Sequence, residues 1–405
     1  MAVEAVEASA LERLKATGVA LIDCDQHYYE TADCLTRHMD PQVARHNFRW
    51  LDYPGGGRRL IVKDRMLRMI IDPTFDQVAM PGSQLQLFKD GKGNDYAAAG
   101  QNVEPLRKSY RDRDARIELL DEQGVDSTWL FPTLGVVIET LIADDVPLAV
   151  ETFRSFNRWV SEEWGFAYKN RLFGVAYITL ADREAAIREL EWLLSQGCRI
   201  INLRSAPLEV VGGGRSPADP YFDPFWARVE EAGVVVACHG GDSGGFAQAS
   251  RWGEMRNSPT HLLTNFAYAT HGFRDIFELI GSMVLHGLFE RFPRLKVISV
   301  EQGSDWVPFL LNRLEHVRNR RDMYQVKGDP LEYFKANVSI SPFAEDDIVR
   351  LAKTIGADRV VFGSDFPHPE GTAEPLAFLD EIDTLPTDDL RKIMGGNAAA
   401  LLGSA

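Results

Sequence analysis

The sequence is poor in cysteine and in basic charge, and it lacks a long apolar run. Four widely spaced cysteines occur among 405 residues, without a CxxC pair, so neither a disulfide framework nor a thiolate zinc site is expected. Lys and Arg number 44 against 59 Asp and Glu, a formal net charge of -15, which argues against nucleic acid and anionic membranes as partners. No apolar run is long enough to span a bilayer, and the acidic N-terminus does not resemble a signal peptide. We therefore expect a soluble cytoplasmic protein with no nucleic-acid or membrane partner.

A GxGxxG loop, the mark of dinucleotide-binding sheets, is also missing after the strands. The chain instead alternates short β-branched runs with amphipathic segments, which is typical of parallel βαβ units. Eight runs are interpreted as strands: Val19–Asp25, Ser127–Thr133, Leu172–Leu180, Arg199–Ser205, Val234–Gly240, Lys296–Glu301, Asn337–Ser341 and Arg359–Asp365. An open doubly wound sheet is the alternative. Because polar, metal-type residues recur at the strand ends, we predict an α/β fold, a (β/α)8 TIM barrel.

The stretch from Thr36 to Arg111 interrupts this alternation. It contains a proline- and glycine-rich turn signal at residues 53–57, and Arg59–Val62 with Met66–Ile71 can form a small hairpin. We predict a single domain over residues 1–405, with residues 36–111 inserted after the first strand as a cap. Such a cap would cover the barrel mouth, where loops carry function in this architecture.

The first strand ends in Asp25-Gln26-His27, with Glu30 shortly after it. Side chains two apart share one face of a strand, so Asp23, Asp25 and His27 can all point into the barrel if the strand keeps its pleat. Asp25 and His27 would then form a chelating pair. A DxH motif alone is more often a capped strand end with polar loop residues, but three acids and a histidine within eight residues favour a metal site.

Three other strands also end in ligand-type side chains: His239 closes the fifth, Glu301 the sixth and Asp365 the eighth. Each has an ordinary explanation, such as a histidine bonded to backbone or an acid in a turn or helix cap. A buried carboxylate is costly unless it meets a cation, and a barrel gathers its strand ends around one axis. The constellation therefore predicts metal at the C-terminal mouth of the barrel.

These motifs resemble those of the amidohydrolase-2 group of metal-dependent TIM barrels over nearly the whole chain. The matching stretches are Asp25-Gln26-His27, Cys238-His239-Gly240-Gly241, Leu288-Phe289-Glu290-Arg291-Phe292-Pro293 and Gly363-Ser364-Asp365-Phe366-Pro367-His368. Two positions depart from the group's pattern, because Asp25 stands in the usual HxH motif and Glu301 stands where histidine is frequent. Hydrolytic members favour imidazole-rich sites that suit zinc, whereas this set is rich in carboxylates.

Six residues make up the expected metal ligand set: Asp25, His27, Glu30, His239, Glu301 and Asp365. Four carboxylates with two imidazoles match the donors of diiron and dimanganese sites, so two iron ions are the favoured cofactor, with zinc or manganese as the alternative. The fuller motif Asp-x-His-Tyr-Tyr-Glu is similar to that of the TIM-barrel nonheme diiron monooxygenases of the diterpenoid biosynthesis type. This resemblance implies O₂-dependent hydroxylation of an apolar small molecule, terpenoid-like or CoA-linked, and an electron donor as partner.

Three functions are weighed. The monooxygenase is favoured over a mononuclear zinc or manganese hydrolase or decarboxylase acting on an ester, lactone or carboxylic acid, and both over a non-catalytic barrel. His368 and Asp305 are the candidate catalytic residues. His368 can donate a hydrogen bond beside the metal, and Asp305 can contact the ligands of the metal. Arg204 either pairs with a substrate anion or neutralises the acidic mouth. Homo-oligomers are common among such barrels, but the sequence leaves the oligomeric state open.

Overall fold

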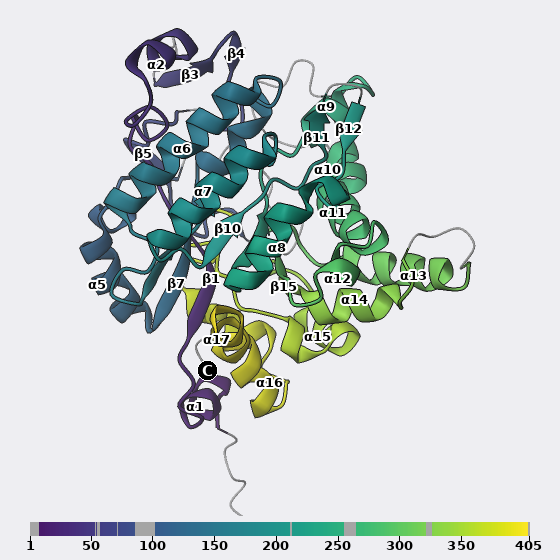
Figure 1. The fold of residues 1–405 in the computed structure, drawn as a ribbon. Coiled ribbons are helices and arrows are strands. Elements are labelled where there is room, and N and C mark those ends of the chain that lie inside the picture. The colour runs from purple at the N-terminus through teal and green to yellow at the C-terminus, as the bar shows by residue number, and fades with distance from the viewer. Residues whose placement is uncertain are drawn as a thin grey trace, which may run out of the picture.

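Seven parallel strand positions and one irregular segment form a closed barrel in the computed structural model, which describes residues 8–52, 54, 57–70, 72–85, 102–210, 213–254, 265–320 and 326–403. The barrel strands are β1 (Ile22–Tyr28), β7 (Ser127–Pro132), β8 (Leu172–Gly174) continuing as β9 (Ala176–Tyr177), β10 (Ile200–Asn202), β13 (Val235–His239), β14 (Lys296–Val300) and β15 (Val338–Ser341). Each pairs in parallel with its neighbours in this order. Figure 1 shows the helices packed around the outside. The predicted (β/α)8 fold is confirmed.

The eighth position is occupied by residues 360–366 without regular strand geometry. On one side the amide of Val361 donates to the carbonyl of Ile340 at 3.0 Å. On the other, the Phe362 carbonyl accepts from Cys24 at 2.8 Å and the Asp365 amide donates to the Asp25 carbonyl at 2.8 Å. This segment closes the ring between β15 and β1. The regular strand predicted at Arg359–Asp365 is therefore wrong in local geometry: the amide of Phe362 donates to the carbonyl of Ile393 at 3.0 Å, and Asp365 at the end of the segment has a positive φ of 55°.

The helices of the outer layer begin at side chains that suit helix starts. An aspartate caps five of them by accepting a backbone amide of the first turn, at Asp112, Asp145, Asp182, Asp329 and Asp347. The layer comprises α5 (Arg113–Gln123), α6 (Val146–Glu163), α7 (Arg183–Ser195), α8 (Asp223–Ala232), α11 (Arg274–Leu285), α13 (Trp306–Arg318), α14 (Pro330–Asn337) and α15 (Ile348–Ile355). Shorter helices are α1 (Ala10–Lys15), α9 (Gly245–Ser250), α10 (Asn265–His271), α12 (Leu288–Arg291), α16 (Thr387–Arg391) and α17 (Asn397–Leu402), and β11 (Leu208–Val210) pairs with β12 (Gly213–Arg215).

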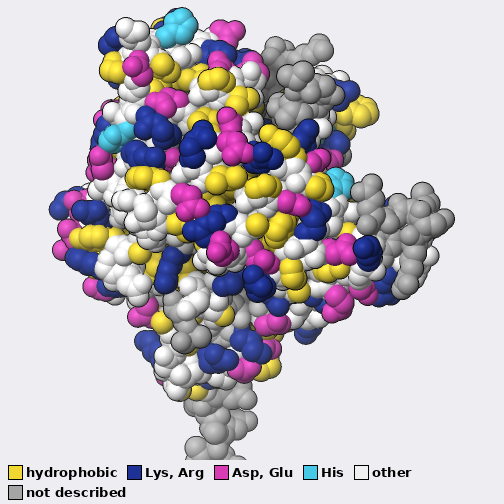
Figure 2. Space-filling model, viewed as in Figure 1, with side chains coloured by type: hydrophobic (Ala, Val, Ile, Leu, Met, Phe, Trp, Pro, Cys, Tyr) yellow, Lys and Arg dark blue, Asp and Glu magenta, His cyan; other side chains and the backbone are white. Residues whose placement is uncertain are grey.

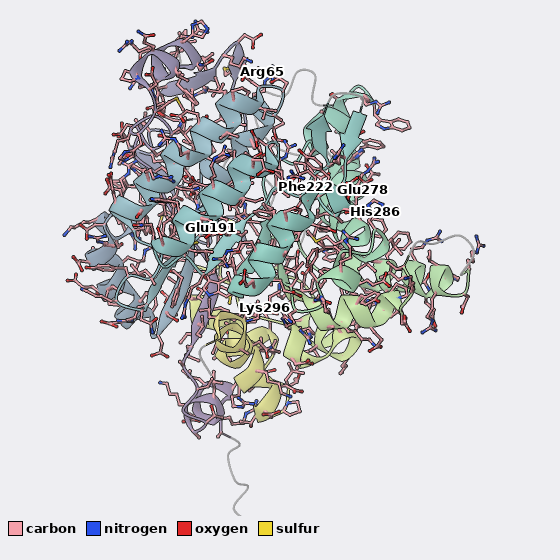
Figure 3. All side chains as sticks on the ribbon, viewed as in Figure 1. Arg65, Glu191, Phe222, Glu278, His286 and Lys296 are labelled. Atoms are coloured by element: carbon pink, nitrogen blue, oxygen red, sulfur yellow. The ribbon has the colours of Figure 1, made fainter. Side chains whose placement is uncertain are left out.

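The inside of the barrel is filled by side chains, and α17 closes its N-terminal end. Trp129, Phe131, Phe173 and Val235 lie in this inner cluster together with Ala398 and Leu402 of α17. Lys296, at the start of β14, donates to the carbonyl of Leu401 at 2.7 Å, and Figure 3 shows it above α17. With that end plugged, the C-terminal mouth is left for a functional site.

The inserted stretch forms a small three-stranded antiparallel sheet beside a helix. Its elements are α2 (Pro41–Asn47), β2 (Phe48–Asp52), β3 (Arg58–Val62), β4 (Arg65–Met66), β5 (Gln77–Ala79) and β6 (Val103–Pro105). The predicted hairpin pairs Val62 with Arg65 and Ile61 with Met66, and β2 adds the third strand. Residues 53, 55–56, 71 and 86–101 of this stretch lie outside the described residues.

Two ion pairs join this insert to the loop before α6. Lys63 Nζ lies 2.8 Å from Asp145 Oδ2, and Arg65, labelled in Figure 3, pairs with Asp144. The predicted role of residues 36–111 as a cap remains a proposal that this tether supports.

The surface carries charge of both signs. Figure 2 shows acidic and basic side chains interspersed with apolar ones over one face. In the described parts of the chain, none of the helices is both long and apolar enough to cross a membrane.

Candidate metal centre

Five metal-type side chains converge at the C-terminal mouth. β1 supplies Asp25 and His27, β13 ends in His239, Glu301 follows β14, and Asp365 lies in the eighth segment. His27 Nε2 lies 3.4 Å from Asp25 Oδ1, 3.4 Å from Asp365 Oδ1 and 3.8 Å from Glu301 Oε2. His239 Nε2 lies 3.3 Å from Asp25 Oδ1 and 3.1 Å from Glu301 Oε2. Five of the six predicted ligands thus fall into two overlapping groups of metal-type residues, one of Asp25, His27, His239 and Glu301 and the other of His27, Glu301, Asp365 and His368.

The orientation of the two imidazoles indicates a cation between them. His27 Nδ1 faces the Pro132 carbonyl at 3.2 Å, and His239 Nδ1 faces the Gly240 carbonyl at 2.6 Å. A carbonyl only accepts, so each Nδ1 carries the proton and each Nε2 presents a lone pair. The two Nε2 atoms nevertheless lie 3.0 Å apart. Two facing lone pairs repel unless a cation binds both, so the residues present fit a metal ion.

Electrostatics favour the same conclusion. Burial, and then the neighbouring Asp365, raise the pKa of Glu301 well above its usual value, while burial and then Glu370 do the same for Asp365. Burial, and then the neighbouring His368, lower the pKa of His27 well below its usual value, so its imidazole stays neutral. Asp25 is the exception: burial opposes its charge, but the neighbouring His239 and His27 outweigh burial and lower its pKa. A divalent cation would allow all three acids to ionise.

Backbone geometry at the mouth is unusual. Glu301 and Asp365 adopt positive φ angles of 50° and 55°, which L residues adopt rarely. Two glycines allow the close approach of neighbouring strands: a Cβ at Gly240 would lie 2.3 Å from the Glu301 carbonyl oxygen, and one at Gly363 would lie 2.8 Å from Asp25 Cβ. Such strained residues gather at functional sites.

His368 lies directly behind Asp365. Its Nδ1 is 2.8 Å from Asp365 Oδ1 and its Nε2 is 3.0 Å from the hydroxyl of Thr133, which also donates to the Tyr28 carbonyl. The His368 ring stacks on His27 with centroids 3.9 Å apart. Thr133 could not be predicted as part of the site, because a threonine at a strand end carries no signal of its own.

A cavity of about 180 Å³ opens onto the centre. Its walls include five carboxylates, Asp25, Glu301, Glu345, Asp365 and Glu370, and the apolar side chains Pro342, Phe343 and Ala344. Its described lining contains no Lys or Arg. A void of roughly 150 Å³ holds benzene, so the cavity suits a single ring rather than a bulky terpenoid.

Glu30 and Asp305 are not brought into the cluster. Glu30 is buried, but its Oε1 accepts from the amides of Leu134 at 2.8 Å and Gly135 at 2.9 Å. Burial raises its pKa to about 7. Asp305 is exposed and lies at the start of α13, outside both groups of metal-type residues. Their predicted roles as ligand and catalytic residue find no support in this geometry.

Asp23 does not share the face of Asp25 and His27 as a regular pleat requires. The pairing of β1 with β7 shifts register between Asp23 and Gln26. Asp23 instead accepts from the amide and hydroxyl of Ser364 at 3.0 and 2.6 Å. The expectation that all three side chains point into the barrel is wrong because of this bulge.

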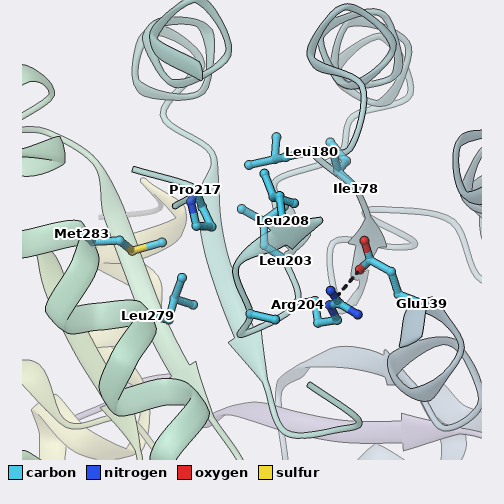
Figure 4. A pocket seen from close by; sticks show the side chains of 10 residues that line it. Glu139, Ile178, Leu180, Leu203, Arg204, Leu208, Pro217, Leu279 and Met283 are labelled. Atoms are coloured by element: carbon cyan, nitrogen blue, oxygen red, sulfur yellow. Dashed lines mark ion pairs between the residues drawn. The ribbon is translucent and has the colours of Figure 1, made fainter. Parts of the chain in front are cut away.

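Arg204 lies at the rim of a different pocket. Figure 4 shows it facing Glu139 among apolar side chains, with Nε 4.0 Å from Glu139 Oε2. Its guanidinium is not part of the described wall of the metal-site cavity. This placement favours the interpretation in which Arg204 neutralises an acid.

Comparison with known proteins identifies the family of the chain. A family model described as amidohydrolase matches residues 22–404. The chain belongs to this amidohydrolase family. An amidohydrolase from Mycobacterium avium subsp. paratuberculosis K-10 superposes on the protein with a TM-score of 0.89 at 36% identity, over 95% of this chain and 99% of that one.

Decarboxylases are also among the relatives of this amidohydrolase. The gamma-resorcylate decarboxylase of Polaromonas sp. is 26% identical over 315 residues, 71% of this chain and 86% of the relative. A dihydroxybenzoic acid decarboxylase from Polaromonas sp. JS666, solved with manganese and the inhibitor 2-nitroresorcinol, has a TM-score of 0.56 at 23% identity, over 79% of this chain and 93% of that one. At that identity the likeness concerns the fold alone.

The expectation of a diiron monooxygenase is wrong, because curated relatives of the chain are gamma-resorcylate decarboxylases and a 2-amino-3-carboxymuconate-6-semialdehyde decarboxylase. The physical reason lies in Glu30, which completed the diiron-like motif but is held by backbone amides. The expectations of two iron ions, an electron donor and a CoA-linked substrate depended on that motif, so they are no longer supported. What stands is a metal-dependent enzyme of the amidohydrolase family that acts on a small molecule.

Proposed function

We propose that this member of the amidohydrolase family is a metal-dependent decarboxylase that removes CO₂ from a small ring carboxylic acid without O₂. The observation that carries the proposal is the pair of facing imidazole nitrogens beside carboxylates that also line a ring-sized cavity. The names of the curated relatives support the reaction type.

The ligands proposed for one metal ion are Asp25, His27, His239, Glu301 and Asp365. Three carboxylates favour a hard cation such as manganese over zinc. When bound, the ion would supply Lewis acidity that fixes and polarises the oxygens of the substrate. The bound charge also offsets the acidic walls, which would otherwise repel a carboxylate.

The chain's own residues would handle the proton. Decarboxylation breaks the bond between the ring carbon and the carboxyl carbon, leaves the electron pair on the ring carbon and requires a proton there. Asp365 lines the cavity and is hydrogen-bonded to His368 behind it. We propose that the proton reaches the substrate from His368 along Asp365, while Thr133 holds the far nitrogen of the imidazole.

The test is to measure metal content by mass spectrometry and then CO₂ release from 2,6-dihydroxybenzoate and other hydroxybenzoates, with manganese added and with O₂ excluded. We expect about one metal ion per chain and turnover that is unaffected by removing O₂. Turnover that requires O₂, or hydrolysis of esters and lactones without any CO₂ release, would overturn the proposal. The Asp365→Asn variant serves as the inactive control.

A further inference from the structure

A buried polar network lies against β1 beside the metal-type residues. It consists of Asp23, Gln26 and Arg116, all fully buried. Arg116 comes from the middle of α5, where a charged residue ordinarily faces solvent. None of the three is among the proposed metal ligands.

Arg116 is a buried cation without an acid next to it. Its Nε donates to the Ser109 carbonyl at 2.8 Å, and its two terminal nitrogens donate to Gln26 Oε1 at 3.1 Å and to the His27 carbonyl at 2.7 Å. Among the residues that the structure describes, Arg116 forms no ion pair within 4.0 Å. The rings of Tyr110, Trp164 and Phe366 surround it at 5.8 to 5.9 Å.

The amide of Gln26 joins this cation to a buried anion. Gln26 Nε2 donates to Asp23 Oδ2 at 2.9 Å, while its oxygen accepts from Arg116. A donor on one side and an acceptor on the other fix the orientation of the amide, because its oxygen must face Arg116 and its nitrogen must face Asp23. Arg116 and Asp23 are therefore linked through one side-chain amide and not by direct contact.

Both ends of the bridge hold the backbone of metal-type residues. Arg116 binds the carbonyl of His27, and Asp23 Oδ1 accepts from the amide of Asp25 at 3.1 Å. Asp23 also binds Ser364, the residue before Asp365. The network thus touches the backbone at or beside three of the five proposed ligands.

We propose that Arg116, Gln26 and Asp23 act as positioning residues that hold Asp25 and His27 in the bulged register needed to bind metal. Burying an arginine without a directly paired acid costs stability, so packing alone does not account for it. A bulged strand has lost part of its ladder and needs other hydrogen bonds to fix its ligands. The inference rests on the proposed metal centre and concerns its preorganisation.

The test measures the affinity for Mn²⁺ alone, by competition with a fluorescent chelator, on folded protein well below its melting temperature. We expect Arg116→Met to weaken Mn²⁺ binding 10- to 100-fold, in line with the effect of removing groups that orient metal ligands. We also expect a changed Mn²⁺ electron paramagnetic resonance line shape. The matched control is Arg171→Met, since Arg171 donates to the carbonyls of Asp126 and Val125 at the start of β7.

Gln26→Glu keeps the volume and the acceptor for Arg116 but replaces the donor to Asp23 by a second carboxylate. It tests the bridge even if Arg116→Met does not fold, and we expect at least 10-fold weaker Mn²⁺ binding. In a double-mutant cycle, the loss of Mn²⁺ affinity in the Arg116→Met, Asp23→Asn double variant should be smaller than the sum of the two single losses. Each single substitution already disrupts the same hydrogen-bonded network. Unchanged affinity and line shape in Gln26→Glu, or an equal loss in Arg171→Met, would overturn the inference. A wild-type protein that binds no Mn²⁺ would instead overturn the proposed function.

Discussion

At the scale of single residues, the facing Nε2 lone pairs of His27 and His239 indicate that the site needs a cation. Replacing His239 by Ala removes one of them and leaves the acids with fewer metal donors. We expect manganese affinity to fall by at least about 100-fold while the fold persists. His286→Ala is the control, because that exposed histidine at the end of α11 lies outside both groups of metal-type residues (Figure 3). Full metal occupancy in His239→Ala would contradict the assignment.

A substitution of His368 can test proton transfer separately from metal binding. Because it contacts Asp365 and Thr133 rather than standing among the proposed ligands, His368→Gln should retain metal. We expect kcat for CO₂ release to fall by about 10² to 10⁴, the usual contribution of a general acid. Thr133→Val, which removes the hydrogen bond to Nε2, should cost less. Loss of metal in His368→Gln would place this histidine among the ligands instead.

Single residues also show where prediction from sequence ends. Asp25, His27, His239, Glu301 and Asp365 could be predicted from their places at strand ends, since a barrel brings such ends together. Glu30 could not be assigned, because its partners Leu134 and Gly135 are more than a hundred residues away in the chain. Arg116 gave no signal at all, since a charged side chain on an amphipathic helix normally predicts exposure.

At the scale of elements, α11 carries a half-buried acid, Asp275, whose charge lowers the stability of the fold at neutral pH. Burial, and then the nearby Glu278 and Asp242, raise the pKa of Asp275 to about 6. A raised pKa means that the folded protein binds the proton more tightly than the unfolded chain, so stability falls as pH rises from about 4 to 6. Asp275→Asn should remove this fall and stabilise the protein at pH 7 by about 1–2 kcal/mol.

Urea unfolding of Asp275→Asn at several pH values measures this effect. Glu278→Gln, one turn further along the same helix face, is the control and should change the pH profile less. Equal slopes for the wild type and Asp275→Asn between pH 4 and 6 would exclude the burial argument.

The insert is a second element whose behaviour can be tested. Asp144→Asn with Asp145→Asn removes the charges that hold Arg65 and Lys63, and asparagine at 145 keeps the helix cap of α6. We expect faster proteolysis within residues 36–111, read by mass spectrometry, with little change in global melting. Asp388→Asn, which breaks an ion pair in α16, should leave the cleavage pattern unchanged. The proposal of a tethered cap fails if the insert is cleaved no faster.

At the scale of the whole molecule, the barrel was predictable from the count and order of its strands, but its closure was not. β1 continues past Asp25 to Tyr28, because pairing with β7 extends through His27 and Phe131. The eighth segment keeps its place through isolated hydrogen bonds rather than a ladder. Neither feature has a sequence signature, since both arise from contacts between distant parts of the chain. The reaction type was also beyond the sequence, because the donor inventory did not reveal which acids face the metal.

Metal binding should therefore stabilise the molecule as a whole. The proposed ligands come from β1, β13 and the segments after β14 and β15, so an ion links both sides of the barrel's closing seam. With free metal at a hundred times its dissociation constant, binding adds about 2.7 kcal/mol. We expect chelation to lower the melting temperature by about 3 °C, and added manganese to restore it. An equal melting temperature with and without chelator would speak against the centre.

The left-handed backbone at Glu301 and Asp365 has a consequence for the protein's evolution in the laboratory. Glycine adopts these angles without strain, so Glu301→Gly should relax the metal-free fold by about 1 kcal/mol while removing a charge from the mouth. A library screened for heat resistance alone would thus drift toward inactive survivors at these two positions. Screens for a more thermostable variant of this protein should therefore also select for catalytic turnover.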